Sequence, residues 1–303
     1  DVKFSALSWY KTEGFYYSSY EKPDGSELSA KTDQHKLYYH KLGTPQKEDQ
    51  VVFGEDAKRR YVFGYITEDQ HYLVINAAES TSGNELYIKD LSNPSNELKC
   101  LVDNFENDHS VVHSKGDLLY VSTNLNAPNK KVITFKYNQP ETEHWKDFIE
   151  ETQYVLTIST GAGYFFAEYM IDAISKVFQY SEKGKLIREV ALPGLGSSSG
   201  FSGKLKDKSL YFSFTNYTTP SSIYLYDPSN GSSKLFKKPE VGFDSNDYES
   251  KQVFFKSKDG TKVPMIITYK KGTELDGNNP TILYGYGGFN ISLTPSFSIV
   301  NAT

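Results

Sequence analysis

A tyrosine in a glycine-rich segment near the C-terminal end of the sequence is the residue best suited to chemistry. Tyr286 precedes Gly287 and Gly288, and an apolar run at residues 281–284 leads into this segment. Glycines let a backbone and a substrate approach closely, and a phenolic hydroxyl can donate a hydrogen bond to an oxygen that becomes negatively charged. The pattern therefore favours Tyr286 as an oxyanion-stabilising residue. A structural interpretation, in which the glycines form only a sharp loop after a strand, is open at this point.

The residues before this loop must position it. Residues 252–269 contain two strand-like runs joined at residues 258–260 (Lys-Asp-Gly), which is a strong hairpin signal. A polar turn at residues 276–280 follows, and we expect the apolar run after it to be a buried strand that ends in the glycine-rich loop. An α/β-hydrolase sheet opens in this way, and its early glycine-rich loop supplies oxyanion-hole donors. We therefore expect residues 245–303 to begin an α/β-hydrolase domain.

A repeat of paired β-like runs organises the preceding residues. The leading runs begin at positions 15, 72, 119, 165 and 211, and the following runs at 37, 86, 132, 177 and 223. After a first interval of 57 between leading runs, both markers recur every 45–49 residues. A period in the mid-forties with several short strands per unit is typical of β-propeller blades. We expect a mainly β chain with about five blades within residues 1–244; the alternative is an irregular β-sandwich.

Two further patterns resemble functional sites but are better explained structurally. Ser198 stands at the centre of a G-x-S-x-G match, yet a nucleophile elbow needs a buried strand before it and a helix after it. Because Ser198 lies within the repeat, we expect a serine-rich loop between blades. His109 and His113 have a spacing that suits a metal ion only on a helix, whereas their neighbours indicate a strand and a turn. We expect surface or blade-edge histidines, no metal site and no cofactor.

Composition narrows the possible functions. The chain has 33 Lys and Arg against 38 Asp and Glu, a net charge of −5, which argues against a nucleic-acid partner. Its 15% aromatic content, with 24 Tyr and 19 Phe, favours β-structure. A single cysteine, Cys100, excludes an internal disulfide framework. The most apolar stretch, residues 154–174, includes Glu168 and Asp172, whose charges are costly inside a bilayer, so we expect core strands and no membrane span.

The combination of blades with the C-terminal motifs closely resembles prolyl oligopeptidase, a family of propeller-gated serine peptidases. The most specific segment is Tyr-Gly-Tyr-Gly-Gly-Phe-Asn at residues 284–290, and Ser-Lys-Asp-Gly-Thr-Lys-Val-Pro at residues 257–264 supports it. The resemblance covers essentially the whole chain and includes residues 2–5, Trp9, and residues 23–25, 35–40 and 244–248.

The resemblance implies a seven-bladed propeller inserted in an α/β-hydrolase domain that cleaves short peptides after proline, with the propeller as a size filter. It implies that Tyr286 helps to form the oxyanion hole and that Phe289 lies beside the proline-binding pocket. Tyr16, in the first blade of this chain, matches a position where the family places an aromatic residue near that pocket. The Ser-Asp-His triad of the family matches no residue of this sequence. We therefore expect a fragment that lacks N-terminal blades and most of the catalytic domain, and that is inactive alone.

The resemblance also indicates partners and leaves alternatives open. The expected partners are short proline-containing peptides, with no nucleic acid and no membrane, and full-length members of the family are usually monomeric. The compartment is not fixed by the sequence: it is cytoplasmic, or periplasmic if the source is bacterial and a signal peptide is lost from the fragment. The alternative function is a non-catalytic propeller that serves as an interaction scaffold. A glycan-active propeller would need paired carboxylates at a tunnel mouth.

Overall fold

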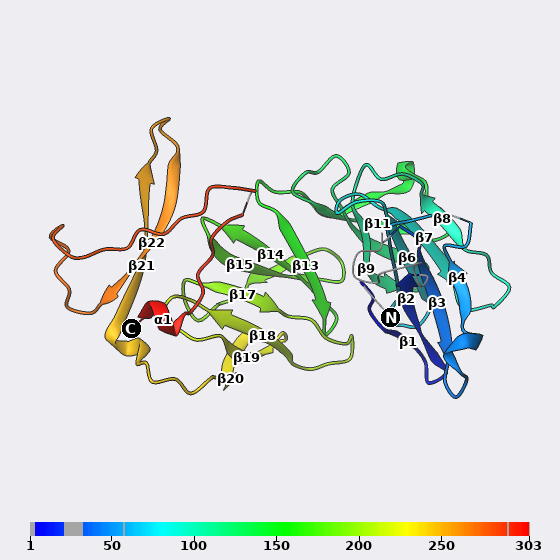
Figure 1. Cartoon of the computed structure of the whole chain (residues 1–303), viewed down its shortest axis with the longest axis horizontal. Coiled ribbons are helices and arrows are strands. Elements are labelled where there is room, and N and C mark those ends of the chain that lie inside the picture. The colour runs from blue at the N-terminus through cyan, green and yellow to red at the C-terminus, as the bar shows by residue number, and fades with distance from the viewer. Residues whose placement is uncertain (1–3, 21–32, 57, 290, 303) are drawn as a thin grey trace, which may run out of the picture. The chain divides into compact units, whose positions relative to one another are not determined.

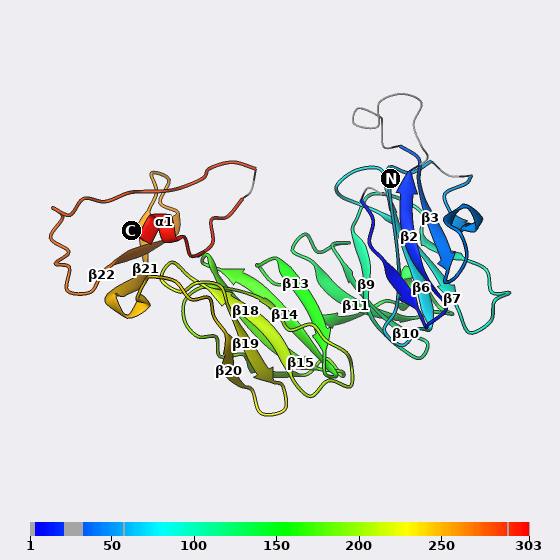
Figure 2. The ribbon, with the colours of Figure 1, turned by 60° about the horizontal axis from the view of Figure 1, so that its bottom comes forward.

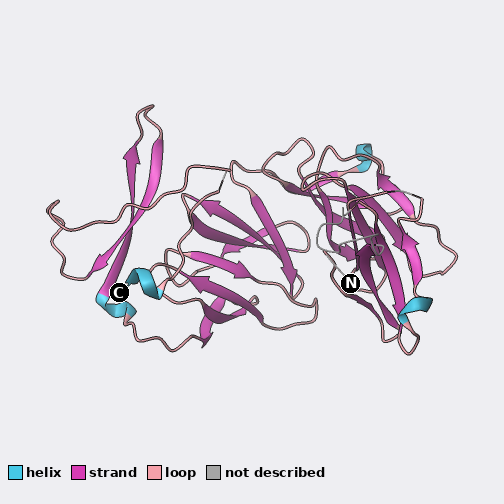
Figure 3. Cartoon of the chain, in the orientation of Figure 1, coloured by secondary structure: helices cyan, strands magenta, loops and turns pink. Residues whose placement is uncertain are grey.

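The computed structural model describes residues 4–20, 33–56, 58–289 and 291–302. Residues 2–3, 23–25 and 290, which carry part of the resemblance, lie outside the described residues. Strands dominate the described part of the chain (Figure 3). The chain divides into two compact units, Asp1–Thr152 and Gln153–Thr303, and each is described by itself.

The first unit contains three four-stranded antiparallel sheets (Figure 1). The first sheet consists of β1 (Ser8–Tyr10), β2 (Gly14–Tyr20), β3 (His35–Lys41) and β4 (Gln50–Phe53). The second consists of β5 (Tyr61–Ile66), β6 (Tyr72–Ala78), β7 (Glu85–Asp90) and β8 (Lys99–Val102). The third consists of β9 (His109–Lys115), β10 (Leu118–Thr123), β11 (Lys131–Lys136) and β12 (Lys146–Ile149). Two short 3₁₀ helices, η1 (Gln46–Glu48) and η2 (Thr142–His144), precede β4 and β12.

The second unit contains two more four-stranded sheets and a long hairpin (Figure 2). The fourth sheet consists of β13 (Leu156–Gly161), β14 (Tyr164–Ile171), β15 (Ile174–Ser181) and β16 (Leu186–Glu189). The fifth consists of β17 (Ser197–Gly200), β18 (Leu210–Thr215), β19 (Ser222–Asp227) and β20 (Ser232–Lys237). A 3₁₀ helix, η3 (Ser245–Asp247), leads into the hairpin of β21 (Tyr248–Lys256) and β22 (Lys262–Lys270), and a short helix, α1 (Ile299–Ala302), follows.

The five sheets confirm the predicted blades. In each sheet the strands are hydrogen-bonded in sequence order, which is the up-and-down arrangement of a propeller blade. The leading runs of the sequence repeat are the second strands of the sheets, and the following runs are the third strands. The repeat therefore marks the two central strands, which carry most of each sheet's packing.

Strand β6 shows why these central runs are so apolar. Tyr72 and Val74 pack in one core cluster with residues of the third sheet, including Leu119, whereas Leu73 and Ile75 pack in another cluster with residues of the first sheet. Side chains alternate between the two faces of a strand, so a strand buried on both faces must be apolar at successive positions. The sheets of this unit thus stack face to face.

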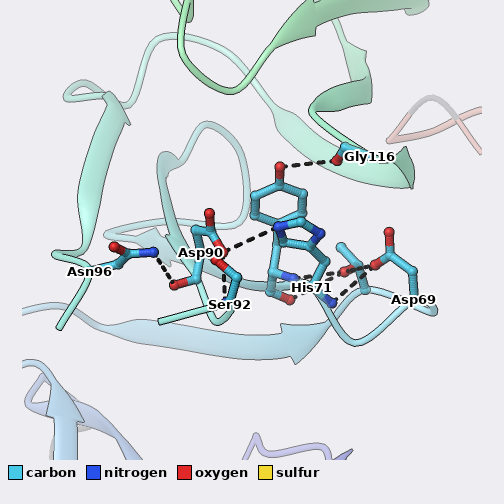
Figure 4. Close-up of polar contacts among 8 residues, drawn as sticks. Asp69, His71, Asp90, Ser92, Asn96 and Gly116 are labelled. Carbon is cyan, nitrogen blue, oxygen red and sulfur yellow. Dashed lines mark hydrogen bonds and ion pairs between the residues drawn. The ribbon is translucent and has the colours of Figure 1, made fainter. Parts of the chain in front are cut away.

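Polar contacts at one end of the second sheet connect it to the third sheet (Figure 4). The hydroxyl of Tyr72 donates to the carbonyl oxygen of Gly116, at 3.0 Å. The neighbouring His71 ring lies 3.2 Å from the Asp90 carboxylate, which also accepts from the Ser92 backbone at 2.8 Å. Hydrogen bonds from Ser92 and the nearby His71 lower the pKa of Asp90 against the opposing effect of partial burial. The Tyr72 hydrogen bond thus joins the second and third sheets, whereas the contacts of Asp90 with His71 and Ser92 lie within the second sheet.

The core of the second unit is aromatic. Phe201 is 1% exposed, and its ring stacks between Phe166 and Phe212, with centroid distances of 5.2 and 4.6 Å. The buried hydroxyl of Tyr226 donates to the Gln179 side-chain oxygen at 2.7 Å, and Gln179 Nε2 donates to the Pro228 carbonyl oxygen at 2.8 Å, so both ends of this buried amide are paired. Among the described residues, none of the helices combines the length and the apolar character needed to cross a membrane.

Candidate functional site

The hairpin that leads to the glycine-rich loop forms as predicted. Strands β21 and β22 pair over nine residues each, and the turn closes with a hydrogen bond from the Ser257 amide to the Thr261 carbonyl oxygen at 3.0 Å. The Asp259 side chain accepts from Ser257 and from the Thr261 amide, and these hydrogen bonds lower the pKa of Asp259 to about 2. Gly260 has φ +85°, a conformation that glycine adopts without strain.

The predicted buried strand at residues 281–284 is wrong. These residues are not in a strand, and Ile282, Leu283 and Tyr284 are 94%, 83% and 79% exposed. An isolated extended run has no ladder hydrogen bonds and no face to bury, so apolar composition alone does not make it a strand. No described strand of this chain pairs with it.

The glycine-rich loop presents Tyr286 outward. Its side chain is 49% exposed, and a Cβ added at Gly285 or Gly287 would meet no atom within 4 Å, so the space on both sides of the tyrosine is open. A hydrogen bond of 3.1 Å from the Ile291 amide to the Gly288 carbonyl oxygen closes a turn after the tyrosine. An exposed phenol can donate a hydrogen bond to an acceptor, and the predicted role of Tyr286 in an oxyanion hole stays a prediction.

The two other predicted site residues lie in different environments. Phe289 is 90% exposed and has φ +54°, so its ring projects from the loop without packing into a core. Tyr16 belongs to the first unit, where it is 7% exposed on β2 and its ring lies 4.9 Å from that of Tyr39, its cross-strand partner. Burial raises the pKa of Tyr16 to about 12. Phe289 thus shares a loop with Tyr286, whereas Tyr16 is a core residue, and the substrate-binding roles of both stay predictions.

Sequence reasoning missed a cavity of about 380 Å³ on the first sheet. Phe15 and Leu7 form part of its wall, and the nearly buried Asp49 carboxylate accepts from the Tyr17 hydroxyl at 2.7 Å and lies 2.7 Å from His40 Nδ1. Phe15, Tyr17 and His40 alternate with the residues that face the second sheet, so the cavity lies on the opposite face. Their scattered positions in the sequence gave no signal for it.

The expected serine-rich loop around Ser198 is instead strand β17. Ser198 is 8% exposed; its amide donates to Ser175 Oγ at 3.0 Å, and its own Oγ lies 3.5 Å from the Glu168 carboxylate. Ser175 Oγ donates to the same carboxylate at 2.8 Å. No helix follows β17, so the structure agrees that Ser198 is not on a nucleophile elbow, and its contacts join the fourth and fifth sheets.

The partly buried Glu168 makes the stability of the second unit dependent on pH. Burial raises the pKa of its carboxyl above the ordinary value of 4.5, and the hydrogen bonds from Ser175 and Ser198 oppose that rise. As pH falls through the raised value, the folded state takes up a proton before the unfolded state does, so stability increases until pH falls below 4.5, where both states are protonated. We expect Glu168→Gln to flatten this dependence and to stabilise the unit more at pH 8 than at pH 4.

Hydrogen exchange of the β14 and β15 amides at the two pH values, corrected for intrinsic exchange rates, measures the effect. Glu240→Gln, at an exposed position, is the matched control. Parallel pH profiles for Glu168→Gln and the unchanged protein would show that the Glu168 carboxylate carries no such cost.

The histidine pair is separated as predicted, but one member is not at the surface. His109 and His113 both lie on strand β9, and His109 is only 3% exposed, with Nδ1 3.1 Å from Thr123 Oγ1. Its ring packs edge-on against Trp145, and burial lowers its pKa. Nothing in the part of the chain that the structure describes groups three or more His, Cys, Asp or Glu side chains in a way that could hold a metal ion.

The stacked four-stranded sheets and the loop that follows them define a class of protein. Residues 1–239 match the family model of the prolyl oligopeptidase N-terminal β-propeller domain. The chain therefore belongs to the prolyl oligopeptidase family, which confirms the predicted family and the propeller. That residues 245–303 begin an α/β-hydrolase domain stays a prediction.

Particular relatives resemble the whole chain. The prolyl endopeptidase of Elizabethkingia meningoseptica is 53% identical over 304 residues, which cover 100% of this chain and 43% of that protein. The prolyl endopeptidase of Dictyostelium discoideum is 35% identical over 99% of this chain and 43% of its own length. Among solved structures, prolyl oligopeptidase B from Galerina marginata matches with a TM-score of 0.87 and 30% identity, over 99% of this chain and 43% of that one. The chain thus spans less than half of the length of the curated relatives it matches.

Proposed function

We propose that this chain is the propeller and the oxyanion loop of a serine peptidase that cleaves short peptides on the carboxyl side of proline. In this proposal residues 1–244 form the gating propeller and residues 245–303 begin the catalytic domain. The observation that carries the proposal is the exposed phenol of Tyr286 on a glycine-rich loop, in a chain 53% identical to a prolyl endopeptidase.

The chemistry follows from the position of that phenol. A serine outside this chain, whose hydroxyl proton passes to a histidine, attacks the carbonyl carbon of the proline residue, and the carbonyl oxygen becomes an oxyanion. Tyr286 donates a hydrogen bond to that oxyanion, and because the charge is larger in the transition state than in the substrate, this contact lowers the barrier. Phe289, which projects from the same loop, offers an apolar ring for the proline side chain.

The propeller supplies selectivity in this proposal. Stacked sheets that surround an entry path exclude folded proteins, so only short peptides reach the reacting groups. The expected partners are proline-containing peptides, and a full-length enzyme is expected to be monomeric.

A hybrid enzyme tests the proposal. We define the hybrid enzyme as the Elizabethkingia meningoseptica prolyl endopeptidase with this chain in place of the segment that it matches. We expect the hybrid enzyme to release product from a proline-linked chromogenic dipeptide and to cut a short proline-containing peptide but not a folded protein. The 303-residue chain alone is expected to release no product, because no residue of it is assigned as a nucleophile.

Two results would refute this assignment. A hybrid enzyme with the circular dichroism of a folded protein but no turnover would favour a non-catalytic scaffold. Steady turnover by the pure 303-residue chain would show that its chemistry does not depend on a triad from outside.

A further inference from the structure

The segment after the glycine-rich loop is hydrogen-bonded to the fifth sheet at residues 295 and 297. Among the described side chains of residues 229–300, Pro295 is the only buried one. The hydroxyl of Ser197 donates to the Pro295 carbonyl oxygen at 2.8 Å, and the Phe297 amide donates to Thr215 Oγ1 at 3.2 Å. The C-terminal segment therefore returns from the hairpin to the sheet (Figure 1).

The two hydroxyl side chains are placed as a pair. Ser197 on β17 and Thr215 on β18 are directly opposite in the antiparallel register, so their side chains lie on the same face of the sheet. Thr215 uses its own proton to donate to the Thr219 carbonyl oxygen at 3.0 Å, which leaves a lone pair for the Phe297 amide. The Ser197 hydroxyl therefore acts as a donor to a carbonyl oxygen of the segment, and the Thr215 hydroxyl acts as an acceptor from an amide of the segment.

Aromatic packing brings together the start and the end of the segment that contains the hairpin and the glycine-rich loop. The ring of Phe243 lies 4.7 Å from that of Tyr248, the first residue of β21, and 5.3 Å from that of Phe297. The hairpin is also tied to the fourth sheet, because Gln252 Nε2 donates to the Asp172 carbonyl oxygen at 2.7 Å. The residues before the hairpin and the segment after the glycine-rich loop are therefore in contact with each other through Phe243 and Phe297.

We propose that Ser197 and Thr215 are positioning residues for Tyr286, and we call the pair, with Pro295 and Phe297, the hydroxyl clasp. This inference rests on the proposed function of Tyr286. No described residue between the end of β22 and the start of α1 belongs to a helix or strand, and the hydrogen bonds of Ser197 and Thr215 fix the backbone at residues 295 and 297, on the C-terminal side of Tyr286. An oxyanion donor misplaced by about 1 Å can cost as much as 100-fold in rate, so anchoring the end of this segment affects catalysis.

The test removes both hydroxyls in the hybrid enzyme. We expect Ser197→Ala combined with Thr215→Val to lower kcat about tenfold with little change in KM, since the clasp acts on the transition state through Tyr286. Ser199→Ala combined with Ser213→Ala is the matched control, because these two serines are the next pair on the same face and hydrogen-bond only with each other, at 2.9 Å. We expect Ser197→Thr and Thr215→Ser, which keep the hydroxyls, to retain kcat.

A double-mutant cycle distinguishes a positioning role from general destabilisation. With Tyr286→Phe already present, the clasp substitutions are expected to lower kcat no further, because their target is gone. An additive loss, or an unchanged kcat on loss of the clasp, would refute the inference while leaving the role of Tyr286 intact. An unchanged kcat in Tyr286→Phe alone would refute the proposed function instead.

A second measurement uses the 303-residue chain itself. The Phe297 amide is hydrogen-bonded to Thr215 Oγ1 and is expected to exchange its hydrogen more slowly than the amides of residues 281–284, which lie in an exposed run. Thr215→Val should abolish this protection and the Ser199→Ala control should keep it. Equal exchange at Phe297 in both variants would show that the clasp does not form.

Discussion

Replacing Tyr286 by phenylalanine in the hybrid enzyme is expected to lower kcat by about 10- to 1000-fold, an interval that includes the roughly 100- to 1000-fold loss typical when one oxyanion donor is removed. The substitution deletes only the hydroxyl, and the ring, which is 49% exposed, has no dense packing to lose. KM should change little, because the hydrogen bond strengthens only as charge develops on the carbonyl oxygen. Steady-state hydrolysis of a proline-linked chromogenic dipeptide measures both constants.

Tyr284→Phe provides the matched control for this prediction. Tyr284 lies two residues before Tyr286, is 79% exposed, and loses the same hydroxyl. We expect its kcat to equal that of the hybrid enzyme. If Tyr286→Phe had the same kcat as Tyr284→Phe, the phenol of Tyr286 would have no part in catalysis, and the assignment of the loop as an oxyanion loop would be refuted.

Replacing Phe201 by alanine is expected to lower the free energy of unfolding of the second unit by about 3–5 kcal/mol, the usual cost of deleting a buried phenylalanine ring. The ring is 1% exposed and stacks on two others, and it meets Tyr226 edge-on with centroids 5.5 Å apart. Alanine leaves a cavity between rigid aromatic rings, which collapse poorly. The backbone at this residue has φ +59°, so the substitution exchanges one non-glycine residue for another in the same strained conformation.

Urea unfolding followed by hydrogen exchange of the second-unit amides measures this loss. Tyr211→Ala is the control, since Tyr211 lies on β18, where its carbonyl oxygen accepts from the Phe201 amide, but is 48% exposed, so this substitution is expected to cost far less. Both tryptophans, Trp9 and Trp145, lie in the first unit, so their fluorescence reports on the first unit and hydrogen exchange is needed for the second. A Phe201→Ala loss no greater than that of Tyr211→Ala would contradict the aromatic core described for this unit.

The fold could be predicted because its inner strands have a strong sequence pattern. Strand β6 is buried on both faces and is correspondingly apolar. The second strands of the other sheets have similar runs, and these runs form the sequence repeat. The outer strands are different: β17 reads Ser-Ser-Ser-Gly, and every residue of β20 is exposed. Such short polar strands are held by ladder hydrogen bonds to a neighbour, which composition cannot show.

The candidate site could be predicted only in part. Tyr286 was identified because glycines beside a phenol form a pattern within a few residues, and its exposure agrees with the proposed role. The strand predicted at residues 281–284 was wrong because a strand depends on partners that a local pattern does not contain. The hydroxyl clasp had no signal at all: Ser197 lies 98 residues from Pro295 in the sequence, and only the register of β17 with β18 brings Thr215 to the same face.

The up-and-down order of the five sheets has a consequence for how the chain is made. Each sheet uses strands that are consecutive in the sequence, so every ladder closes a short loop at small entropic cost. Ribosomes add about 5–20 residues per second, and the emerging polypeptide therefore completes one such sheet every few seconds. Within each unit, every sheet after the first meets a finished neighbour on which to bury its apolar face, which limits the time that aggregation-prone surface is exposed during synthesis.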